Sequence, residues 1–317
     1  MTQKLPQFAY FKGEIVPYSQ ASVGVMTQAF NYGTGVFGGI RAYWNEDDEQ
    51  LYVFRPLDHF KRVLQSAHIM RMKVDKTPGE LLEILIELLR KENFHENAYI
   101  RPIIYKSTET ISVRLHDIDD EITIYTVPFG RYAAREEGLH VCFSAWQRVS
   151  DNMMPARGKV SGAYVNSALI KSDALLAGYD EAFVLTSDGH LSEGSAANVM
   201  MVRDGKLITS PITDDILEGI TRRTILQLAQ EKLGLDVVER KIDRTEVYLA
   251  DELLMCGTGM QVAAVTRIEH RTVGTGKMGD ITKKLRDLYF DVVFGRVAEY
   301  RHWLTPVYSE ETIKTAR

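Results

Sequence analysis

Lys159 lies in the segment ARGKVSGAYVNSALIKSDALLAG, which begins at Ala156 and places the lysine among small residues just before an apolar helix. Small residues let a backbone approach another group closely. A free lysine amine is protonated at neutral pH, but desolvation or a nearby cation can lower its pKa to roughly 7–8, where it can form an imine with an aldehyde. A solvent-facing loop lysine is the plainer interpretation, and this stretch alone favours it.

Two glycine-bearing turns have the form of anion sites. Gly219 and Ile220 lead into a helix at Thr221, and the free N–H groups of a first helical turn can hold a phosphate together with the threonine hydroxyl. In CGTGMQ, a buried strand ends in a turn that contains Thr258 and Gly259, where successive N–H groups can point one way. A plain helix N-cap and an ordinary turn are the simpler interpretations, and the sequence of each turn alone favours them.

Two charged side chains also have both a chemical and a plain interpretation. Glu193, in HLSEGSAANVMMV, precedes small residues and a strand, so its carboxylate can pair with a cationic ring nitrogen or simply face water. Arg62 lies off the apolar stripe of its helix, beside Lys61. Its guanidinium can bind a phosphate through two hydrogen bonds or belong to a solvated helix face, and the second interpretation is favoured on sequence alone.

The stretches NYGTGVFGGIRAY and AYIRPIIYK supply aromatic side chains and one arginine. Strand alternation places Tyr99 and Arg101 on one face of a strand. With Tyr32 and Phe37, these residues suit a pocket that accepts both apolar side chains and a carboxylate. Alternatively, the tyrosines are half-buried sheet residues and the arginine extends its charged end to water.

Composition and motifs argue against several classes of function. The 317 residues are 45% hydrophobic and 26% charged with a formal net charge of −5, which is typical of a globular protein without a nucleic-acid-binding surface. The sequence has no HExxH, paired His/Cys spacing, GxSxG or Walker A motif, so no metal site is expected. Two isolated cysteines and the lack of a signal peptide or long apolar run predict a cytoplasmic protein without a membrane segment.

The order of the predicted elements indicates an α+β protein. FAYFKGEIVP predicts a hairpin with its turn at Lys12-Gly13, and many later strands are also separated by turn residues. Helical spacing predicts helices in LDHFKRVLQSAHIM and in TRRTILQLAQEKLG, and Thr77 and Glu80 form the capping box of another helix. We therefore expect mixed, mostly antiparallel sheets with flanking helices rather than a doubly wound parallel sheet.

The sequence also predicts two domains. The segment 130–138 is short, polar and bounded by glycines, which is typical of a linker. It would separate a small N-terminal α+β domain, residues 1–129, from a large C-terminal α+β domain, residues 139–317. The large domain would carry Lys159.

Each of these features is weak alone, but their combination and order resemble the branched-chain amino acid aminotransferases, which are pyridoxal-phosphate enzymes of fold type IV. The resemblance rests on RPLDHFKRVLQSA, AYIRP, PARGKVSGAYVNSAL, SEGSAAN, EGITRRT and the GTG turn, and it covers nearly the whole chain, up to the RHWLTPVY tail. It implies the cofactor pyridoxal 5'-phosphate and ping-pong transamination of leucine, isoleucine and valine with 2-oxoglutarate.

The resemblance also implies a role for each candidate residue. Lys159 would form the Schiff base with the cofactor and then move protons, while Glu193 would keep the pyridine nitrogen protonated. The other cofactor contacts would be made by Arg62, Tyr164, Leu217, Ile220, Thr221 and Thr258. The substrate's α-carboxylate would be bound by Tyr99, Thr258 and Gly259, and its side chain by Tyr32, Phe37, Arg101 and Tyr132.

Two positions depart from the family pattern. Gly38 stands where many relatives have glutamate in FEGIRAY, so a polar neighbour of the side-chain pocket would be missing, and Ala197 stands where EGSGEN-type relatives carry glutamate. These departures keep a second interpretation open, a fold type IV transaminase with altered substrate choice such as D-amino acids or (R)-amines. A binding protein that keeps the fold without catalysis is a third, and the intact lysine, glutamate and phosphate-site residues argue against it.

The expected partners are small molecules and a second copy of the chain. Amino acids and 2-oxo acids would be the ligands, and neither nucleic acid nor membrane is expected. The family resemblance implies a homodimer or a higher homo-oligomer, in which a loop of one copy completes the site of the other. The segment TETISVRLHDID, residues 108–119, is the candidate for that loop.

Overall fold

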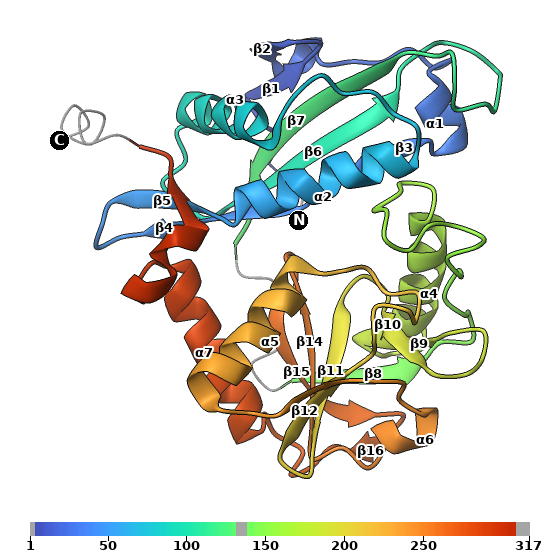
Figure 1. Cartoon of the computed structure of the whole chain (residues 1–317), viewed down its shortest axis with the longest axis vertical. Coiled ribbons are helices and arrows are strands. Elements are labelled where there is room, and N and C mark those ends of the chain that lie inside the picture. Colours follow the sequence, from blue (N-terminus) through green and yellow to red (C-terminus); the bar gives the residue numbers. More distant parts are fainter. Residues whose placement is uncertain (1–3, 131–137, 309–317) are drawn as a thin grey trace. The chain divides into compact units, whose positions relative to one another are not determined.

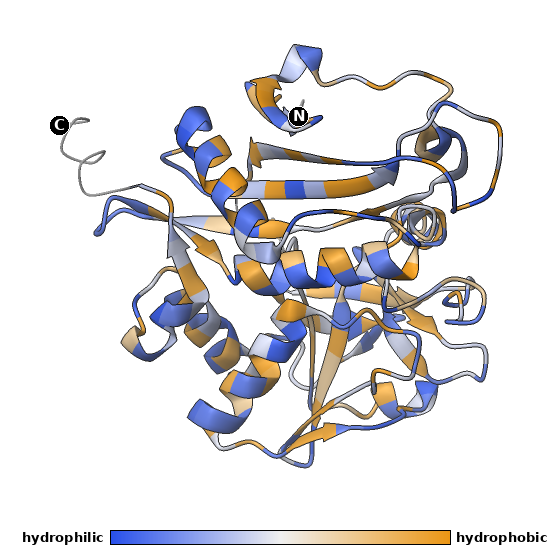
Figure 2. Cartoon of the chain, turned by 45° about the horizontal axis from the view of Figure 1, so that its top comes forward, coloured by the Kyte–Doolittle hydropathy of each residue, from blue (hydrophilic) through white to orange (hydrophobic). Residues whose placement is uncertain are grey.

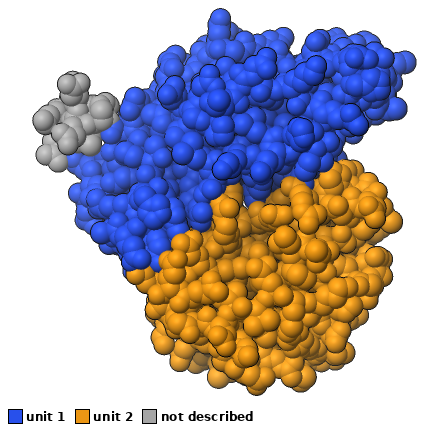
Figure 3. Space-filling view, in the orientation of Figure 1, with its two compact units in different colours: residues 1–130, 158–162, 291–317 blue, residues 131–157, 163–290 orange. Residues whose placement is uncertain are grey.

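The computed structural model describes residues 4–130 and 138–308 (Figure 1). The chain divides into two compact units, which Figure 3 shows in different colours. Unit 1 consists of residues 1–130, 158–162 and 291–317. Unit 2 consists of residues 131–157 and 163–290. Each unit has its own sheet and its own helices.

Unit 1 is built on an eight-stranded sheet in the order β17-β5-β4-β6-β7-β1-β2, with β3 paired to β6. All of these pairs are antiparallel. β17 comes from the far end of the chain and places Leu304 opposite Phe54 of β5. The strands are β1 (Phe8–Phe11), β2 (Glu14–Pro17), β3 (Gly35–Phe37), β4 (Ile40–Asn45), β5 (Gln50–Phe54), β6 (Ala98–Lys106), β7 (Asp120–Pro128) and β17 (Leu304–Pro306).

The two longest helices of unit 1 each bury an apolar stripe, and Figure 2 shows hydrophobic and hydrophilic residues alternating along the helices of the chain. In α2 (Pro56–Ile69), the stripe includes Phe60, Val63 and Ala67. α3 (Pro78–Glu92) begins with a capping box, in which the Glu80 N–H donates to Thr77 Oγ1 at 3.2 Å and the Thr77 N–H donates to the Glu80 carboxylate at 2.7 Å. The shorter helices are α1 (Gln28–Tyr32), η1 (Tyr18–Gln20) and η2 (Ala298–Trp303).

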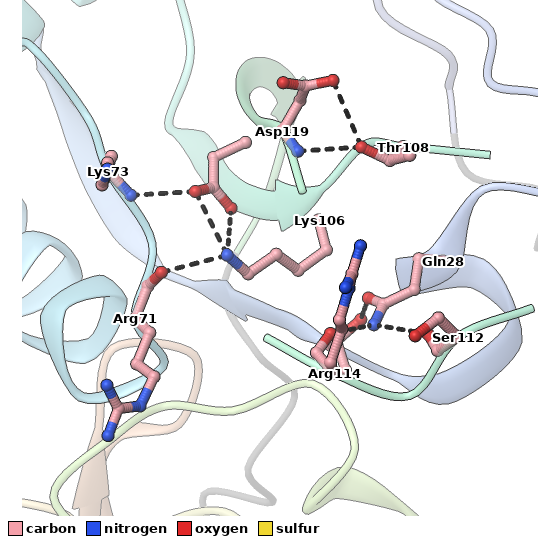
Figure 4. Close-up of polar contacts among 10 residues, drawn as sticks. Gln28, Arg71, Lys73, Lys106, Thr108, Ser112, Arg114 and Asp119 are labelled. Carbon is pink, nitrogen blue, oxygen red and sulfur yellow. Dashed lines mark hydrogen bonds and ion pairs between the residues drawn. The ribbon is translucent and has the colours of Figure 1, made fainter. Parts of the chain in front are cut away.

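A buried ion pair closes the base of the loop between β6 and β7 (Figure 4). Lys106 and Asp120 lie opposite each other at the last pair of the two strands. Lys106 Nζ is 2.9 Å from Asp120 Oδ1, and the two side chains are 0% and 6% exposed. Nζ also donates to the carbonyl of Arg71 at 3.0 Å, and the Lys73 N–H donates to Asp120 Oδ2 at 2.9 Å. The base of the loop is therefore held in one place by paired charges.

Unit 2 is built on a nine-stranded mixed sheet in the order β10-β9-β8-β15-β14-β11-β12-β13, with β16 paired to β15. The pairs β8–β9, β8–β15 and β12–β13 are parallel, and the others are antiparallel. The strands are β8 (Leu139–Phe143), β9 (Glu181–Leu185), β10 (Leu191–Gly194), β11 (Asn198–Arg203), β12 (Lys206–Thr209), β13 (Val237–Glu239), β14 (Glu252–Gly257), β15 (Gln261–Ile268) and β16 (Arg271–Thr272).

The core of unit 2 packs around β11, β14 and β15, whose buried side chains include Met201, Met255 and Val265. Their near-continuous apolar sequences match strands that are covered on both faces. The helices are α4 (Tyr164–Leu176), α5 (Ile220–Leu233), α6 (Arg244–Val247) and α7 (Asp280–Val293), of which the last residues of α7 belong to unit 1.

The structure confirms the expected fold class, because both units combine helices with antiparallel or mixed sheets. The hairpin turn at Lys12 and Gly13 is present, with φ values of 50° and 91°. α5 ends at Gly234 as expected, because this residue has a φ of 61° and its N–H bonds the carbonyl of Ala229.

The division into units differs from the expected domains at two places. The segment Gly158–Gly162, with Lys159, and the segment from Asp291 onward group with the N-terminal residues rather than with the C-terminal ones. Long-range pairing explains the difference: the lysine segment hydrogen-bonds to β3, and β17 pairs with β5. The linker prediction, 130–138, falls almost wholly outside the described residues, so the expected domain limits stay a prediction.

Candidate active site

In unit 1, the lysine segment lies along β3. The Phe37 N–H donates to the carbonyl of Lys159 at 3.0 Å, and the Ser161 N–H donates to the carbonyl of Gly35 at 2.8 Å. At Gly33, whose φ is 67°, a Cβ would lie only 2.9 Å from the Cα of Gly162. The small residues around the lysine are therefore needed because two backbones meet there without room for side chains.

A serine on α2 ties Lys159 to the helix that carries Arg62. The Lys159 N–H donates to Ser66 Oγ at 3.2 Å, and this hydroxyl donates to the carbonyl of Arg62 at 2.8 Å. Ser66 is fully buried. The amine of Lys159 lies 5.1 Å from the centre of the Phe37 ring, beside an aromatic surface.

Three of the predicted pocket residues come together on one face of the unit 1 sheet. The guanidinium carbon of Arg101 lies 4.5 Å from the centre of the Phe37 ring and 5.2 Å from that of Tyr99. Arg101 also donates to the hydroxyl of Tyr99 at 3.0 Å. A Cβ at Gly39 would overlap this hydroxyl, so the glycine leaves the space in which the Tyr99 side chain lies. The cluster combines one cation with two aromatic rings, as the sequence predicted.

Gly38 faces the other side of the sheet. A Cβ there would lie 2.8 Å from both Pro102 Cγ and Val63 Cγ2, among buried residues of β6 and α2. Gly38 and Gly39 lie between β3 and β4, and a Cβ at Gly39 would instead meet the Tyr99 side chain. A side chain at this position would therefore start against Pro102 and Val63, and the expectation that a glutamate here neighbours the side-chain pocket stays a prediction.

Tyr32 lies apart from the Phe37, Tyr99 and Arg101 cluster. It is 40% exposed, and its hydroxyl donates to the carbonyl of Ile111, in the loop between β6 and β7, at 2.7 Å. Tyr132, the remaining residue predicted to line the pocket, lies outside the described residues.

In unit 2, Glu193 is buried and held by three donors. Its Oε1 lies 2.8 Å from an Nη of Arg148. Its Oε2 accepts hydrogen bonds from the side-chain amide of Asn198 at 3.0 Å and from the N–H of Leu217 at 3.3 Å. Because only 3% of the residue is exposed, these contacts fix the carboxylate in one orientation and engage both of its oxygens. The interpretation of Glu193 as a water-facing turn residue is wrong.

Asn198 links the other predicted cofactor residues of unit 2. Its side-chain amide donates to the carbonyl of Leu217 at 3.0 Å, and a Cβ at Gly219, the N-cap of α5, would overlap its Oδ1. On the backbone, Asn198 pairs with Cys256, directly before the turn that contains Thr258. The first turn of α5 and the GTG turn thus flank one asparagine.

The first turn of α5 has the properties of an anion site. Gly219 has no side chain to cap the helix, so the first N–H groups depend on another acceptor. Ile220 and Thr221 begin the helix and are 4% and 3% exposed.

Tyr164 is the first residue of α4 and is half-buried, and Gly259 lies with Thr258 in the turn between β14 and β15.

Cys256 stands beside this region but is not a nucleophile. Burial raises the pKa of its thiol to about 12, with the nearby Glu193 charge acting in the same direction and Arg222 opposing both. The thiol therefore stays protonated at neutral pH.

Three residues of the site were not predicted from the sequence: Ser66, Arg148 and Asn198. The Asn198 side chain has a local signal, since SEGSAAN places it five residues after Glu193 on a strand that starts in small residues. Arg148 precedes Glu193 by 45 residues and Ser66 precedes Lys159 by 93, as numbered in the chain, so neither contact has a local signal. Such partners become visible only when the sheets are assembled.

Within the described residues, no group of three or more His, Cys, Asp or Glu side chains is placed to hold a metal ion. Over the same part of the chain, each helix is too short or too polar to cross a membrane.

Comparisons with known proteins define the class of this chain. Residues 35–268 match the family model for amino-transferase class IV, so the chain belongs to the class IV aminotransferases. A probable branched-chain-amino-acid aminotransferase of Aquifex aeolicus is 45% identical over 96% of this chain and 97% of its own length.

Solved structures agree with this assignment. The branched-chain amino acid aminotransferase of Thermobaculum terrenum, in its PLP form, superposes with a TM-score of 0.92 at 40% identity, covering 97% of this chain and 100% of the other. The branched-chain amino acid aminotransferase of T.th., complexed with N-(5'-phosphopyridoxyl)-L-glutamate, has a TM-score of 0.91 at 36% identity, again covering 97% and 100%.

Proposed function

We propose that this protein is a pyridoxal-phosphate-dependent aminotransferase that moves the amino group between branched-chain L-amino acids and 2-oxoglutarate. The observation that carries the proposal is the buried carboxylate of Glu193, held by Arg148, Asn198 and Leu217. A fixed, ionised carboxylate is the partner that a protonated ring nitrogen requires. Full-length similarity to branched-chain aminotransferases supports the same reaction.

The donor set of unit 2 fits the cofactor. The first N–H groups of α5 and the hydroxyls of Thr221 and Thr258 suit a phosphate, because a helix N-terminus attracts anions. Glycine at position 219 leaves this helix end unobstructed. Leu217 would pack on the ring, Tyr164 would contact its hydroxyl and Arg62 would add a cation for the phosphate.

Lys159 is proposed to hold the cofactor covalently through its amine and to act as the acid and base of the reaction. When bound, pyridoxal phosphate supplies the electron sink that makes loss of the α-proton feasible. The amine of Lys159 would accept the proton from the substrate's α-carbon and later donate a proton to complete the transfer. Ser66 and β3 fix the backbone of Lys159, so its Cα stays in place while the amine at the end of the side chain moves.

The proposed substrate pocket explains how one site accepts two kinds of side chain. Phe37 and Tyr99 offer aromatic surface to leucine, isoleucine or valine, while Arg101 offers a cation to the side-chain carboxylate of glutamate. The glutamate adduct bound by the T.th. enzyme supports glutamate as the second amino donor. Thr258, Gly259 and Tyr99 are proposed to receive the α-carboxylate, and Tyr132 to line the pocket.

Borohydride reduction of the holoprotein tests the covalent attachment. The peptide that contains Lys159 should gain the mass of a pyridoxyl group, and Lys159→Ala should lose steady transamination of leucine. Lys206→Ala is the matched control, because Lys206 is an exposed lysine of unit 2. An unmodified Lys159 peptide, or full turnover in Lys159→Ala, would end the proposal.

A substrate panel tests the choice of amino donor. Leucine, isoleucine and valine should react with 2-oxoglutarate, whereas D-alanine and an (R)-arylamine should not. Activity confined to D-alanine or the arylamine would instead establish the alternative of altered substrate choice.

A homodimer or higher homo-oligomer is also part of the proposal. Large hydrophobic side chains are exposed on two segments of unit 1 that hydrogen bonds join: Val23, Val25, Met26, Phe30, Tyr32, Ile111 and Val113. The buried Gln28 amide of α1 holds the second segment by donating to the carbonyls of Ser112 at 3.2 Å and Arg114 at 2.9 Å (Figure 4). An apolar surface of this extent fits a second copy of the chain.

Light scattering tests the assembly. The wild type should have at least twice the mass of one chain, and Ile111→Asp should lower both the mass and the activity. Leu249→Asp, an exposed leucine of unit 2, should change neither. A monomeric wild type would contradict this part.

The cytoplasm remains the proposed location, since both cysteines are unpaired thiols.

A further inference from the structure

A cavity in unit 1 lies away from all the residues assigned above. It has a volume of about 360 Å³ and is lined by residues 4, 5, 7, 91–96 and 128. It adjoins the carboxyl end of α3 and the start of β1, which are neighbours in Figure 1. Its volume falls within the range of small-molecule sites.

The cavity contains a buried carboxylate with an unused oxygen. Glu92, the last residue of α3, is only 4% exposed although it lines the cavity. Its Oε1 accepts hydrogen bonds from the N–H groups of Gln7 and Phe8, each at 2.8 Å. Among the residues that the structure describes, no donor bonds its Oε2. This oxygen is not among the fully buried side-chain atoms that lack a partner, so it stays accessible and can accept a hydrogen bond from a cationic group in the cavity.

The end of α3 strengthens the preference for a cation. Its last carbonyl groups carry the negative end of the helix dipole, next to the Glu92 carboxylate. Asn93 ends the helix in the left-handed conformation, with φ 54°, and its N–H satisfies only the carbonyl of Leu89. Burial also raises the pKa of the Glu92 carboxyl, against the two backbone hydrogen bonds and the charge of Lys4.

The cavity walls carry two lysines and, besides Glu92, one exposed carboxylate, Glu96. Lys4 and Lys91 line it and are exposed, so their amines are available to an anionic group. Lys91 is only weakly engaged, at 4.0 Å from the exposed Glu87 carboxylate. The His95 ring is a firmer wall, because it stacks on Tyr308 with ring centres 5.8 Å apart.

We propose that this cavity is a second binding site, for a small zwitterion of the α-amino acid class. The ammonium group pairs with Glu92 Oε2 and the carboxylate lies toward Lys4 and Lys91. A simple amine satisfies only the buried carboxylate, and a simple acid satisfies only the lysines. The site is independent of the proposed reaction, because it shares no residue with the Lys159 or Glu193 clusters.

Binding of 2-aminoisobutyrate to the full-length holoprotein tests the proposal. This amino acid has no α-hydrogen, so transamination cannot consume it. Titration followed by amide NMR should shift the Gln7 and Phe8 signals, whose N–H groups bond Glu92. Isobutyrate, which lacks the amine, and 2-aminoisobutyramide, which lacks the carboxylate, should each bind about tenfold more weakly or worse.

Three variants make the test specific. Glu92→Gln keeps an oxygen for the Gln7 and Phe8 N–H groups but loses the charge, and it should weaken binding about tenfold or more. Lys91→Gln should weaken it severalfold, and this surface change keeps the test valid even if Glu92→Gln does not fold. Glu83→Gln, an exposed residue of the same helix, should bind like the wild type.

Two outcomes would overturn the site. One is equal affinity in Glu92→Gln, Lys91→Gln and the wild type, and the other is the absence of shifts at Gln7 and Phe8. Both are distinct from failure of the proposed reaction, which is judged by leucine turnover and by the mass of the Lys159 peptide.

Discussion

Removing the charge of Lys106 should destabilise the protein strongly. In Lys106→Met, the Asp120 carboxylate loses its cation while its side chain stays 6% exposed. Removal of one partner of a buried ion pair costs about 3–5 kcal/mol. Asp120 keeps the N–H of Lys73 as a donor, so we expect a loss near the lower limit, about 3 kcal/mol.

The assay is reversible urea unfolding supported by thermal melting. For a cooperative unit of about 150–250 residues, a loss of about 3 kcal/mol lowers the melting temperature by roughly 6–12 °C. The double variant Lys106→Met/Asp120→Asn should recover a large part of the loss, because no unpaired charge remains buried. Raising the salt concentration should change the result little, since buried charges are poorly screened.

An exposed pair provides the control. Lys283 pairs with Asp287 one turn away on α7, with side chains 66% and 56% exposed. Lys283→Met should cost no more than about 0.5 kcal/mol. The reasoning is refuted if Lys106→Met costs less than about 1 kcal/mol, or if the double variant is less stable than both single variants.

Three further predictions concern other parts of the chain. Gly39→Ala should raise the KM for leucine by about tenfold or more with little change in stability, because its Cβ overlaps the Tyr99 hydroxyl, whereas Gly38→Ala should cost about 1–3 kcal/mol of stability through overpacking against Val63. Steady-state kinetics and urea unfolding separate the two effects, and a reversed pattern would contradict the different directions of the two glycines. The pKa of Glu246 is lowered from its ordinary 4.5, chiefly by hydrogen bonds from Arg240, so the ionised carboxylate stabilises the fold above pH 4.5 and this contribution is lost as the pH falls through the lower folded-state pKa. In urea unfolding, the stability advantage of wild type over Glu246→Gln should therefore shrink on acidification, and an advantage that grows would count against the ion pair. Burial raises the pKa of the half-buried Cys142 thiol to about 11 and that of the buried Cys256 thiol to about 12, so neither thiol should react with iodoacetamide at pH 8 until urea is added. Mass spectrometry measures the labelling, and rapid labelling of the native protein would contradict the raised pKa values.

Local chemistry made part of the fold predictable from the sequence. The capping box at Thr77 and Glu80 and the stop at Gly234 depend on residues within one helical turn, and the structure contains both. The hairpin at Lys12-Gly13 is equally local, since its turn residues adopt positive φ.

Long-range pairing was beyond the sequence. Nothing near Lys159 indicates that its segment bonds β3, more than a hundred residues earlier in the chain, and so belongs to unit 1. The Glu193 partner Arg148 is hidden in the same way, because it lies outside the strands, 45 residues before the glutamate, and meets it only in the folded chain. The type of each candidate residue was predictable, but the groups that hold it were not.

The start of α5 has a consequence for the durability of the protein. A side-chain cap typically contributes about 1 kcal/mol to a helix, and Gly219 cannot provide one. An anion seated at Ile220 and Thr221 would do that work, so the helix would be firmest when the protein is loaded. In protein that has lost its phosphate ligand, α5 should then unfold first at residue 220. Storage or heating would inactivate the protein by opening this helix end before the sheets unfold.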